Sequence, residues 1–370
     1  MIKKSLEASE RIDWLRLSRT QQIGPITFRE LLRRFKTPRE ALEALPDLAR
    51  RGGRTKALSP APLKKIEQEV RVLEKKGGRF VALCEPDYPE ALAAIDDAPP
   101  VLAVLGNLSL LHKPCLGIVG SRNASLNGRK MSERLAHDLG EANYVITSGL
   151  ARGIDTSAHK AALATGTIAA MAGGVDIIYP EENRGLYEQI AESGCLISDQ
   201  PLSTEPRANL FPRRNRLISG LSLGVIVVEA AKRSGSLITA RMALEQGRDV
   251  FAVPGSPLDP RANGTNDLIR QGAVLTEKIS DILEHLATPK LSLCEPTPPD
   301  FEAPLLVVDE NQLDTGREKI LENLSTCPVP VDELVRSCQM SLPLVLTVLL
   351  ELELAGRLER HPGHTVSLIG

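Results

Sequence analysis

The sequence predicts an α/β protein in which an extended Rossmann-like domain with a parallel sheet lies between a small helical domain and a winged-helix domain. Three observations predict this fold class. Short apolar runs alternate with amphipathic stretches over residues 79–286, helical spacing dominates residues 1–78, and helical segments with two short strands follow residue 316. A chain of 370 residues is long enough for two or three domains, because single cores stop growing well below that length.

The N-terminal domain, residues 1–78, is expected to consist of short helices. Apolar Phe28, Leu31 and Phe35 follow a Gly-Pro turn at helical spacing. Helix-hairpin-helix units use such a turn to present backbone N–H groups to a phosphate, and a small all-α packing module explains the pattern equally well. The expected helices are Ile12–Leu17, Thr27–Phe35, Pro38–Leu48 and Pro62–Leu73.

The central domain, residues 79–286, is expected to hold a parallel sheet covered by helices on both faces. Most of its apolar runs are followed by a Gly/Ser/Pro turn and then by an amphipathic stretch of about 10–15 residues. Strands buried on both faces are continuously apolar, as these runs are. The expected strands are Phe80–Cys84, Val101–Leu105, Cys115–Val119, Tyr144–Thr147, Thr167–Met171, Cys195–Ser198, Val225–Glu229 and Val250–Val253.

Residues 287–316 hold five prolines and six acidic residues against one lysine, which predicts a flexible linker. The block 317–370 then has the element order of a winged helix. Its recognition-helix position, Ser341–Ala355, contains Glu351 and Glu353 and no Lys or Arg. A helix that enters the major groove needs donors for phosphate and guanine, so we expect this module to contact another protein or to pack on the rest of the chain rather than to read duplex DNA. The expected helices are Arg317–Leu324, Val331–Cys338 and Leu342–Ala355.

Composition limits the partner and the compartment. The formal net charge is −2, yet residues 1–75 carry 18 Lys and Arg against 10 Asp and Glu, which is compatible with a polyanionic partner and equally with solvated helix faces. The six cysteines show no C-x-x-C pair and no metal-ligand spacing, so we expect reduced thiols, no metal and a cytoplasmic location. The sequence has no secretory signal and no run of 18 apolar residues, which argues against a membrane span.

The sharpest motif is the turn Gly120-Ser121-Arg122 after an apolar strand. Glycine lets the backbone N–H groups of such a turn, together with the following helix N-terminus, face an anion. Ser121 adds a hydroxyl donor, and Arg122 can hold a phosphate with two parallel hydrogen bonds. The spacing is not G-x-G-x-x-G, and no acidic residue stands where a ribose would need it, so the sequence disfavours a dinucleotide cofactor.

Four further Gly-rich turns follow other strands of the same domain. Because the carboxyl ends of parallel strands meet at one edge of a sheet, we expect the five turns to form a long ridge that accepts anions rather than a pocket for one small molecule. Individual glycines could equally serve the tight turns themselves. The four turns are Ser148–Gly153, which includes Arg152, and Gly173-Gly174, Ser234–Ser236 and Pro254–Ser256.

A second sharp motif opens with an aromatic ring and continues with cations. Phe211 and Pro212 precede Arg213, Arg214, Asn215 and Arg216, and Arg207 lies just upstream. Closely spaced arginines with one ring are typical of a surface that tracks a nucleic-acid backbone and stacks a base. That interpretation requires an exposed Phe211, whereas a core Phe211 leaves the patch without a base contact. Some of these residues are also expected to be structural, because Asn215 and Arg216 precede the apolar Leu217 and Ile218 and can tie this helix to the sheet.

Signals for catalysis are weaker than signals for binding. Asp155, His159, Asp176 and Glu229 are scattered near strand ends, and a catalytic site requires a mutual geometry that the sequence alone does not give. Glu229 is interpreted either as a base or as a partner of the Ser234–Ser236 turn or of an arginine. His159 fits a capping or core role better than that of a general base.

With these residues laid out, the chain resembles the DNA-processing protein A family, also called DprA or Smf. The resemblance covers about 200 residues, essentially the whole α/β domain, and its N-terminal and C-terminal blocks resemble the sterile-alpha-motif-like and winged-helix domains of longer members. The matching stretches are GIVGSR (117–122), SGLARGIDTSAH (148–159), YPEEN (179–183), LISDQP (196–201), FPRRNRLISGLS (211–222) and VVEAAKRSGSLITARMALEQGRDVFAVPG (227–255).

The resemblance implies a non-enzymatic homodimer without a nucleotide cofactor. It implies binding and protection of single-stranded DNA and help in loading the RecA recombinase during natural transformation. The strand-gripping positions carried over by motif are Gly120, Ser121, Arg122 and Phe211, with Arg184 and Arg207 more loosely placed. Arg207 stands in a region where a lysine is common in the family.

Two other functions remain open, and one assembly surface is expected. A hydrolase of the nucleoside-monophosphate glycosidase type shares the broad superfamily, and Arg122 with Glu229 would suit such a substrate. A scaffold that binds recombinase and touches DNA only weakly is the other alternative. Residues 266–286 carry apolar side chains on more than one face, which predicts a two-fold homodimer contact unless these side chains are simply core.

Overall fold

The computed structural model describes residues 3–55, 58–288, 310–361 and 363–369, and these form two compact units. Unit 1 comprises Met1–Glu7 and Glu67–Lys290, and unit 2 comprises Ala8–Ile66 and Leu291–Gly370. The units therefore cut across the expected division into 1–78, 79–286 and 317–370. Most of the expected linker, residues 289–309, lies outside the described residues.

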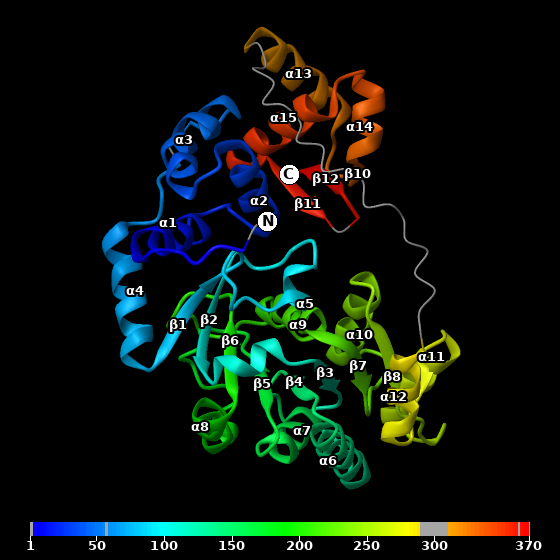
Figure 1. Cartoon of the computed structure of the whole chain (residues 1–370). Helices are drawn as coiled ribbons and strands as arrows, with labels where there is room; N and C mark the ends of the chain where they lie inside the picture. Colours follow the sequence, from blue (N-terminus) through cyan, green and yellow to red (C-terminus); the bar gives the residue numbers. More distant parts are fainter. Residues whose placement is uncertain (1–2, 56–57, 289–309, 362, 370) are drawn as a thin grey trace. The chain divides into compact units, whose positions relative to one another are not determined.

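Unit 1 is built on a nine-stranded sheet whose strand order is β1-β2-β6-β5-β4-β3-β7-β8-β9 (Figure 1). Six of the neighbouring pairs are parallel, and β2 alone runs against both of its neighbours. The strands are β1 (Gly78–Ala82), β2 (Val101–Gly106), β3 (Cys115–Val119), β4 (Val145–Ser148), β5 (Thr167–Ala170), β6 (Cys195–Ser198), β7 (Ser222–Val227), β8 (Asp249–Ala252) and β9 (Val274–Leu275).

The expectation of a fully parallel sheet is therefore corrected at β2. A strand buried on both faces is continuously apolar whichever way it runs, and β2 is buried over five of its six residues. Its composition consequently carries no information about its direction. The two-residue strand β9 was not expected from the sequence, because two residues give no pattern.

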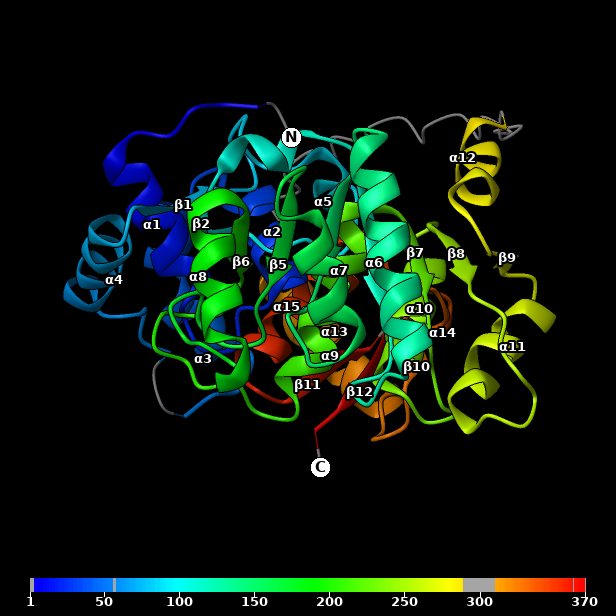
Figure 2. The ribbon, with the colours of Figure 1, turned by 90° about the horizontal axis from the view of Figure 1, so that it is seen from below.

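Two apolar layers lie on the opposite faces of this sheet, and alternate residues of β3 enter them in turn. Cys115 and Val119 join one cluster, and Leu116 and Ile118 join the other. The first layer also takes side chains from α5 (Glu90–Ala93), α9 (Leu210–Leu221) and α10 (Gly235–Glu245). The second takes them from α6 (Leu126–Glu141), α7 (Ile154–Ala162) and α12 (Ile279–Ala287), of which α6 and α7 lie in front of the sheet in Figure 2.

The chain order of the parallel strands creates a switch point. From β3 the chain adds β4, β5 and β6 on one side, and from β7 it adds β8 and β9 on the other. In open α/β sheets, ligands bind outside the carboxyl ends of the strands at such a point. The remaining elements of unit 1 are α4 (Leu63–Lys75, which begins in unit 2), α8 (Arg184–Ser193), α11 (Asn263–Arg270) and the 3₁₀ turns Leu108–His112, Glu181–Asn183 and Pro260–Ala262.

The apolar side chains of 266–286 divide between core and surface. Ile269 packs against one core layer, and Ile279 and Leu283 pack against the other. Leu275 is 46% exposed, and Leu258, in the loop after β8, is 93% exposed. Most of the expected dimer surface is therefore core, and exposed apolar area remains only at a few positions.

Unit 2 contains the N-terminal helices and the winged helix. The single tryptophan, Trp14, packs against Phe28 with ring centroids 5.0 Å apart. The helices are α1 (Ala8–Ser18), α2 (Pro25–Phe35), α3 (Pro38–Arg51), α13 (Glu310–Asn323), α14 (Val331–Cys338) and α15 (Leu342–Leu354), and the strands are β10 (Val329–Pro330), β11 (Leu358–His361) and β12 (Thr365–Leu368). Helix α13 begins at Glu310, seven residues earlier than expected, inside the stretch assigned to the linker.

The two acidic residues of the recognition-helix position bind other parts of unit 2. Fully buried Glu351 accepts a hydrogen bond from Arg317 at 2.7 Å. Glu353 accepts from the Thr27 hydroxyl at 2.7 Å and from Arg360 at 2.9 Å. Helix α15 also packs against α3, where a Cβ at Gly52 would overlap the carbonyl oxygen of Glu351. The acidic character of this helix thus serves internal pairing.

No single described helix is both long and apolar enough to cross a membrane. Helices α14 and α15 meet that criterion only together, as a pair bent by 116°.

Candidate nucleic-acid interface

The turns after β3 and β4 contact each other at the switch point. A Cβ at Gly120 would lie 2.6 Å from Ile154 Cγ1, so only glycine lets the chain pass this close to α7. Gly153, with φ of 79°, closes the second turn in the left-handed region. The backbone N–H of Ile154 then donates to the carbonyl oxygen of Ser121 at 3.2 Å. Ser121 and Gly120 are half-buried here, and Arg122 is exposed.

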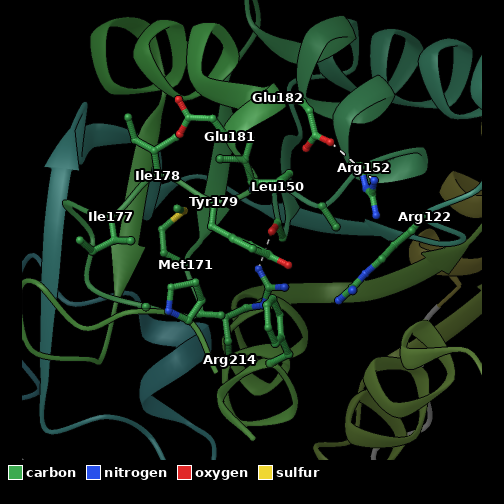
Figure 3. Close-up of a pocket in the computed structure, with 17 residues that line it drawn as sticks. Arg122, Leu150, Arg152, Met171, Ile177, Ile178, Tyr179, Glu181, Glu182 and Arg214 are labelled. Carbon is green, nitrogen blue, oxygen red and sulfur yellow. Dashed lines mark hydrogen bonds and ion pairs between the residues drawn. The ribbon is translucent and has the colours of Figure 1, made fainter. Parts of the chain in front are cut away.

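A pocket of about 370 Å³ opens beside these turns. Figure 3 shows Arg122 and Arg152 on the same side of the pocket, with Arg214 and Tyr179 at its centre. Apolar side chains and backbone make up most of the remaining wall, which is typical of a binding site with a few orienting polar groups. The lining residues are Arg122, Gly149–Arg152, Met171–Gly173, Ile177–Glu182, Pro206, Phe211 and Arg214.

Two rings and one cation form a contiguous cluster in this pocket, with the planes of the two rings tilted by 57° to each other. The Arg122 guanidinium carbon lies 5.2 Å from the centroid of Phe211, and the Tyr179 ring centroid lies 5.5 Å from the same point. Tyr179 is 44% exposed, and Phe211 is half-buried. Arginine above an aromatic face is attracted to the ring electrons. Tyr179 was not among the site residues expected from the sequence, although it is the first residue of the YPEEN stretch at 179–183.

Five of the expected site residues are exposed arginines, and two of these pair with acidic neighbours. Arg152 lies 3.6 Å from Glu182, and Arg184 lies 2.6 Å from Glu181. The hydrogen bond from Arg184 lowers the pKa of Glu181. Exposed ion pairs of this kind contribute little free energy, so both arginines can exchange a carboxylate for a phosphate. The exposed set is Arg122, Arg152, Arg184, Arg207 and Arg213.

The other three residues of the second motif lie inside unit 1, which differs from the expected surface role. Arg214 donates to the carbonyl oxygens of Gly149 and Ala170, at the ends of β4 and β5. Arg216 pairs with Asp199 at 2.5 Å. The amide of Asn215 lies 3.5 Å from the carbonyl oxygen of Gly235. All three hold neighbouring segments together, and only Arg214 also lines the pocket.

Burial changes the electrostatics around Arg214. Loss of water lowers the pKa of its guanidinium to about 10, against the favourable charge of Asp155. Burial also disfavours the charged form of Asp155 and so raises its pKa, although the carboxylate accepts backbone hydrogen bonds from Gly149 at 3.1 Å and Ala151 at 3.4 Å. The pair therefore fixes the loop 149–151 that forms one wall of the pocket.

His159 is a buried structural histidine. The Thr167 hydroxyl donates to the Ile146 carbonyl at 2.8 Å, so His159 Nδ1–H donates to Thr167 at 2.7 Å. Its Nε2 accepts from the Leu150 backbone at 3.3 Å, and burial lowers its pKa to about 3. The ring is therefore neutral, and the expectation of a core role fits this geometry.

The remaining acidic candidates also make structural contacts. Asp176 accepts from the Ser203 backbone at 2.9 Å. Glu229 accepts from Ser125, which is neither of the partners expected from the sequence. None of Asp155, His159 and Glu229 lines the pocket. Among the described residues, no group of three or more His, Cys, Asp or Glu side chains is arranged to hold a metal.

The other Gly-rich turns lie at the carboxyl ends of β5, β7 and β8, on the same edge of the sheet. Gly173 lines the pocket. Ser234 and Ser236 bond each other at 2.7 Å and begin α10. The Gly255 N–H donates to the Asn266 side chain at 3.1 Å. The donors of the last two turns are thus partly used within the fold, whereas the arginines of the first two turns, Arg122 and Arg152, are exposed.

Comparison with known proteins gives matches over all three parts of the chain. Residues 79–287 match the family described as DNA recombination-mediator protein A. Residues 8–72 match a DprA-like N-terminal helix-hairpin-helix domain, and residues 307–364 match a DprA winged-helix domain.

Several individual proteins are similar to this chain. Protein Smf of Escherichia coli is 42% identical over 310 residues, which cover 83% of this chain and 82% of that protein. The DNA processing protein DprA of Bacillus subtilis is 43% identical over 63% of this chain and 79% of its own length.

Two solved structures share both fold and sequence. DprA from Streptococcus pneumoniae gives a TM-score of 0.63 at 36% identity and covers 76% of this chain and 98% of that one. A structure that describes the single-stranded DNA binding mode of DNA processing protein A from Helicobacter pylori gives 0.52 at 30% identity, over 56% of this chain and 95% of that one.

Proposed function

Since the chain belongs to the DNA recombination-mediator protein A family, we propose that it processes DNA by binding single strands at the carboxyl edge of its sheet. One observation carries the proposal: exposed Arg122 lies over Phe211, and exposed Tyr179 lies beside the same ring. This arrangement offers a phosphate contact and a stacking surface within one pocket.

The cationic half of this site matches a phosphate backbone. Arg122 donates in a planar fork that suits a phosphate oxygen pair. Arg152, Arg207 and Arg213 are exposed on the turns and the helix start around it. Arginines that neutralise phosphates release counterions and bind all sequences alike.

The aromatic half matches an unpaired base. Every base has a π-face, so stacking is tolerant of sequence and contributes about 1–3 kcal/mol per base. A paired base does not expose that face, which favours single strands over duplexes. The single-stranded DNA binding named for the Helicobacter pylori relative supports the same choice.

The chain is proposed to act without turnover. The acidic side chains that line the pocket, Glu181 and Glu182, pair with arginines, and Glu229 contacts Ser125 outside the pocket. Both carboxylates that line the pocket are thus held by arginines in this structure, which argues against the glycosidase alternative. Hydrolysis of nucleoside monophosphates that disappears in Glu229→Gln would contradict the proposal.

The name of the family supports a role in mediating recombination. We therefore propose that the bound strand is protected from nucleases and passed to the RecA recombinase in the cytoplasm. Filament formation by RecA on strands pre-coated by single-strand binding protein tests this step. We expect the wild-type chain to stimulate filament formation and the Arg122→Ala variant to lose this effect. Equal stimulation by the wild type and the variant would show that RecA loading does not depend on the Arg122 site.

A two-fold homodimer is proposed to double the number of strand-binding sites, which raises affinity for long strands through effective concentration. Leu258 and Leu275 are the exposed apolar side chains available near the sheet end formed by β8 and β9. Sedimentation at micromolar concentration should give twice the chain mass of 40.1 kDa. A single-chain mass would contradict the dimer, and a dimer that survives Leu258→Glu with Leu275→Glu would place it on another face.

The binding proposal itself is tested by fluorescence anisotropy with labelled single-stranded and duplex oligonucleotides over a salt series. Single strands should bind more tightly than duplexes, and their affinity should fall as the salt concentration rises. In a plot of log affinity against log salt concentration, each neutralised phosphate should contribute about 0.7 to the magnitude of the slope. Absent binding, or equal binding of duplex, would contradict it.

A further inference from the structure

The carboxylate of Glu229 contacts the N-terminus of α6 from the segment after β7. Glu229 follows β7, which pairs with β3 at the switch point, and α6 is the helix that follows β3 (Figure 1). The carboxylate accepts from the Ser125 backbone N–H at 2.9 Å and from the Ser125 hydroxyl at 2.5 Å. The Ser125 side chain in turn accepts from the Gly128 N–H at 2.9 Å.

The carboxylate packs directly on the helix backbone. A Cβ at Gly128 would lie 2.5 Å from Glu229 Cδ and within 2.8 Å of both carboxylate oxygens. In nucleotide-binding Rossmann domains, the phosphate of the ligand occupies the N-terminus of this first helix. Here an internal carboxylate binds the N-cap residue Ser125, whose hydroxyl caps the Gly128 N–H, and leaves no room beside Gly128 for another anion.

The contacts of Glu229 hold one end of the turn that carries Arg122. At the other end, the Val228 N–H donates to the Val119 carbonyl oxygen at 3.1 Å, and Ile154 binds Ser121. Between these anchors, Arg122 and Asn123 are exposed. Both ends of the turn are thus fixed by hydrogen bonds, and Arg122 and Asn123 between them are accessible to a ligand.

We propose that Glu229 is a positioning residue that replaces a ligand phosphate at α6 and thereby presents Arg122 to single-stranded DNA. The inference rests on the proposed function, since it concerns the same phosphate contact. On this proposal, Glu229 increases the affinity for single-stranded DNA by positioning Arg122, although its negative charge alone would decrease that affinity. A carboxylate near a polyanion repels it, so neutralising Glu229 by charge alone would tighten binding, whereas loss of positioning weakens it.

The experiment measures the affinity of the full chain for a labelled oligothymidylate by anisotropy. Glu229→Ala should weaken binding about tenfold, near the loss of one charge-assisted hydrogen bond. Glu229→Gln keeps the shape and one acceptor oxygen, and should give a smaller loss. Glu141→Gln is the matched control, because it removes one negative charge from the far end of α6. Its affinity should be equal to or slightly above that of the wild type.

A double-mutant cycle separates positioning from general damage. In an Arg122→Ala background, Glu229→Ala should cost little further affinity, because the group it positions is gone. Equal losses in both backgrounds, or unchanged or tighter binding by Glu229→Gln, would overturn the inference. If Glu229→Ala fails to fold, Glu229→Gln carries the cycle. A wild-type chain without affinity for single strands would instead overturn the proposed function, and the inference with it.

Discussion

Arg122 combines exposure with a defined orientation above Phe211. We expect Arg122→Ala to weaken single-strand binding about tenfold for all base sequences, because a phosphate contact carries no sequence information. The salt slope should fall by about 0.7, the value for one phosphate on a single strand. Anisotropy over a salt series measures both. Unchanged affinity in a variant with an unaltered thermal melt would remove Arg122 from the site.

Phe211 offers the complementary contrast. Phe211→Leu removes the ring and keeps an apolar side chain, so binding should lose about 1–3 kcal/mol of stacking while the salt slope stays unchanged. Tyr179→Leu should behave in the same way with a smaller loss, because its ring is more exposed than that of Phe211. A change in slope equal to that of Arg122→Ala would show that the rings act only by supporting the guanidinium.

The residue scale also shows where sequence reasoning stops. In the Gly120–Arg122 motif, Arg122 is exposed, as a phosphate contact requires. The consecutive residues Arg214, Asn215 and Arg216 are all buried, because α9 packs against the sheet on one side and against α5 and α10 on others. The apolar Leu217 and Ile218 that follow indicate a structural role for Asn215 and Arg216, but only the packing of the helix reveals that these side chains bind carbonyl oxygens and Asp199.

At the scale of elements, the loop after β4 depends on a neutral histidine. The pKa of His159 in the folded chain is about 3, below the value of about 6.5 in an unfolded chain. Between these values the unfolded state binds a proton that the folded state does not. The contribution of His159 is therefore complete above pH 6.5 and is lost progressively as the pH falls.

This gives a pH-dependent prediction for unit 1. From pH 7.5 to 5.5, the stability advantage of the wild type over His159→Gln should shrink by about 1.4 kcal/mol, because glutamine keeps a donor and an acceptor without a titrating ring. Urea denaturation at the two pH values measures the difference. Parallel pH profiles for the two proteins would show that the ring titrates normally in the fold.

The elements and most strand directions were predictable from the sequence, and the direction of β2 was not. Cys115–Val119, Cys195–Ser198 and Val331–Cys338 have the expected bounds, because buried strands and amphipathic helices have strong periodic signals. The reversal of β2 had no such signal. The start of α13 was missed because helical residues 310–316 are acidic and polar, a composition shared with linkers.

At the scale of the whole molecule, a contact between distant segments joins the N-terminal helices to the winged helix within unit 2. Gly52 has an ordinary helical φ of −69°, so replacing it tests the close approach to Glu351 without backbone strain. Gly52→Ala should destabilise unit 2 by about 2 kcal/mol, within the range for overpacking. Gly24→Ala, which has open space around the new methyl group, should cost clearly less.

Urea denaturation of both variants measures this difference. Equal midpoints for the two proteins would show that α3 and α15 do not pack as described. The contact was not predictable from the sequence, because residues 52 and 351 lie far apart in the chain and no sequence pattern around either residue indicates which residue it contacts.

The aromatic residues are divided between the two units in a way that is useful in the laboratory. The only tryptophan, Trp14, is buried in unit 2, and all four tyrosines, at 88, 144, 179 and 187, lie in unit 1. Tryptophan emission therefore reports on the environment of unit 2, while tyrosine difference absorbance reports on unit 1. The intact chain carries a separate optical probe for each of its units, and the order in which they unfold can be followed without any label.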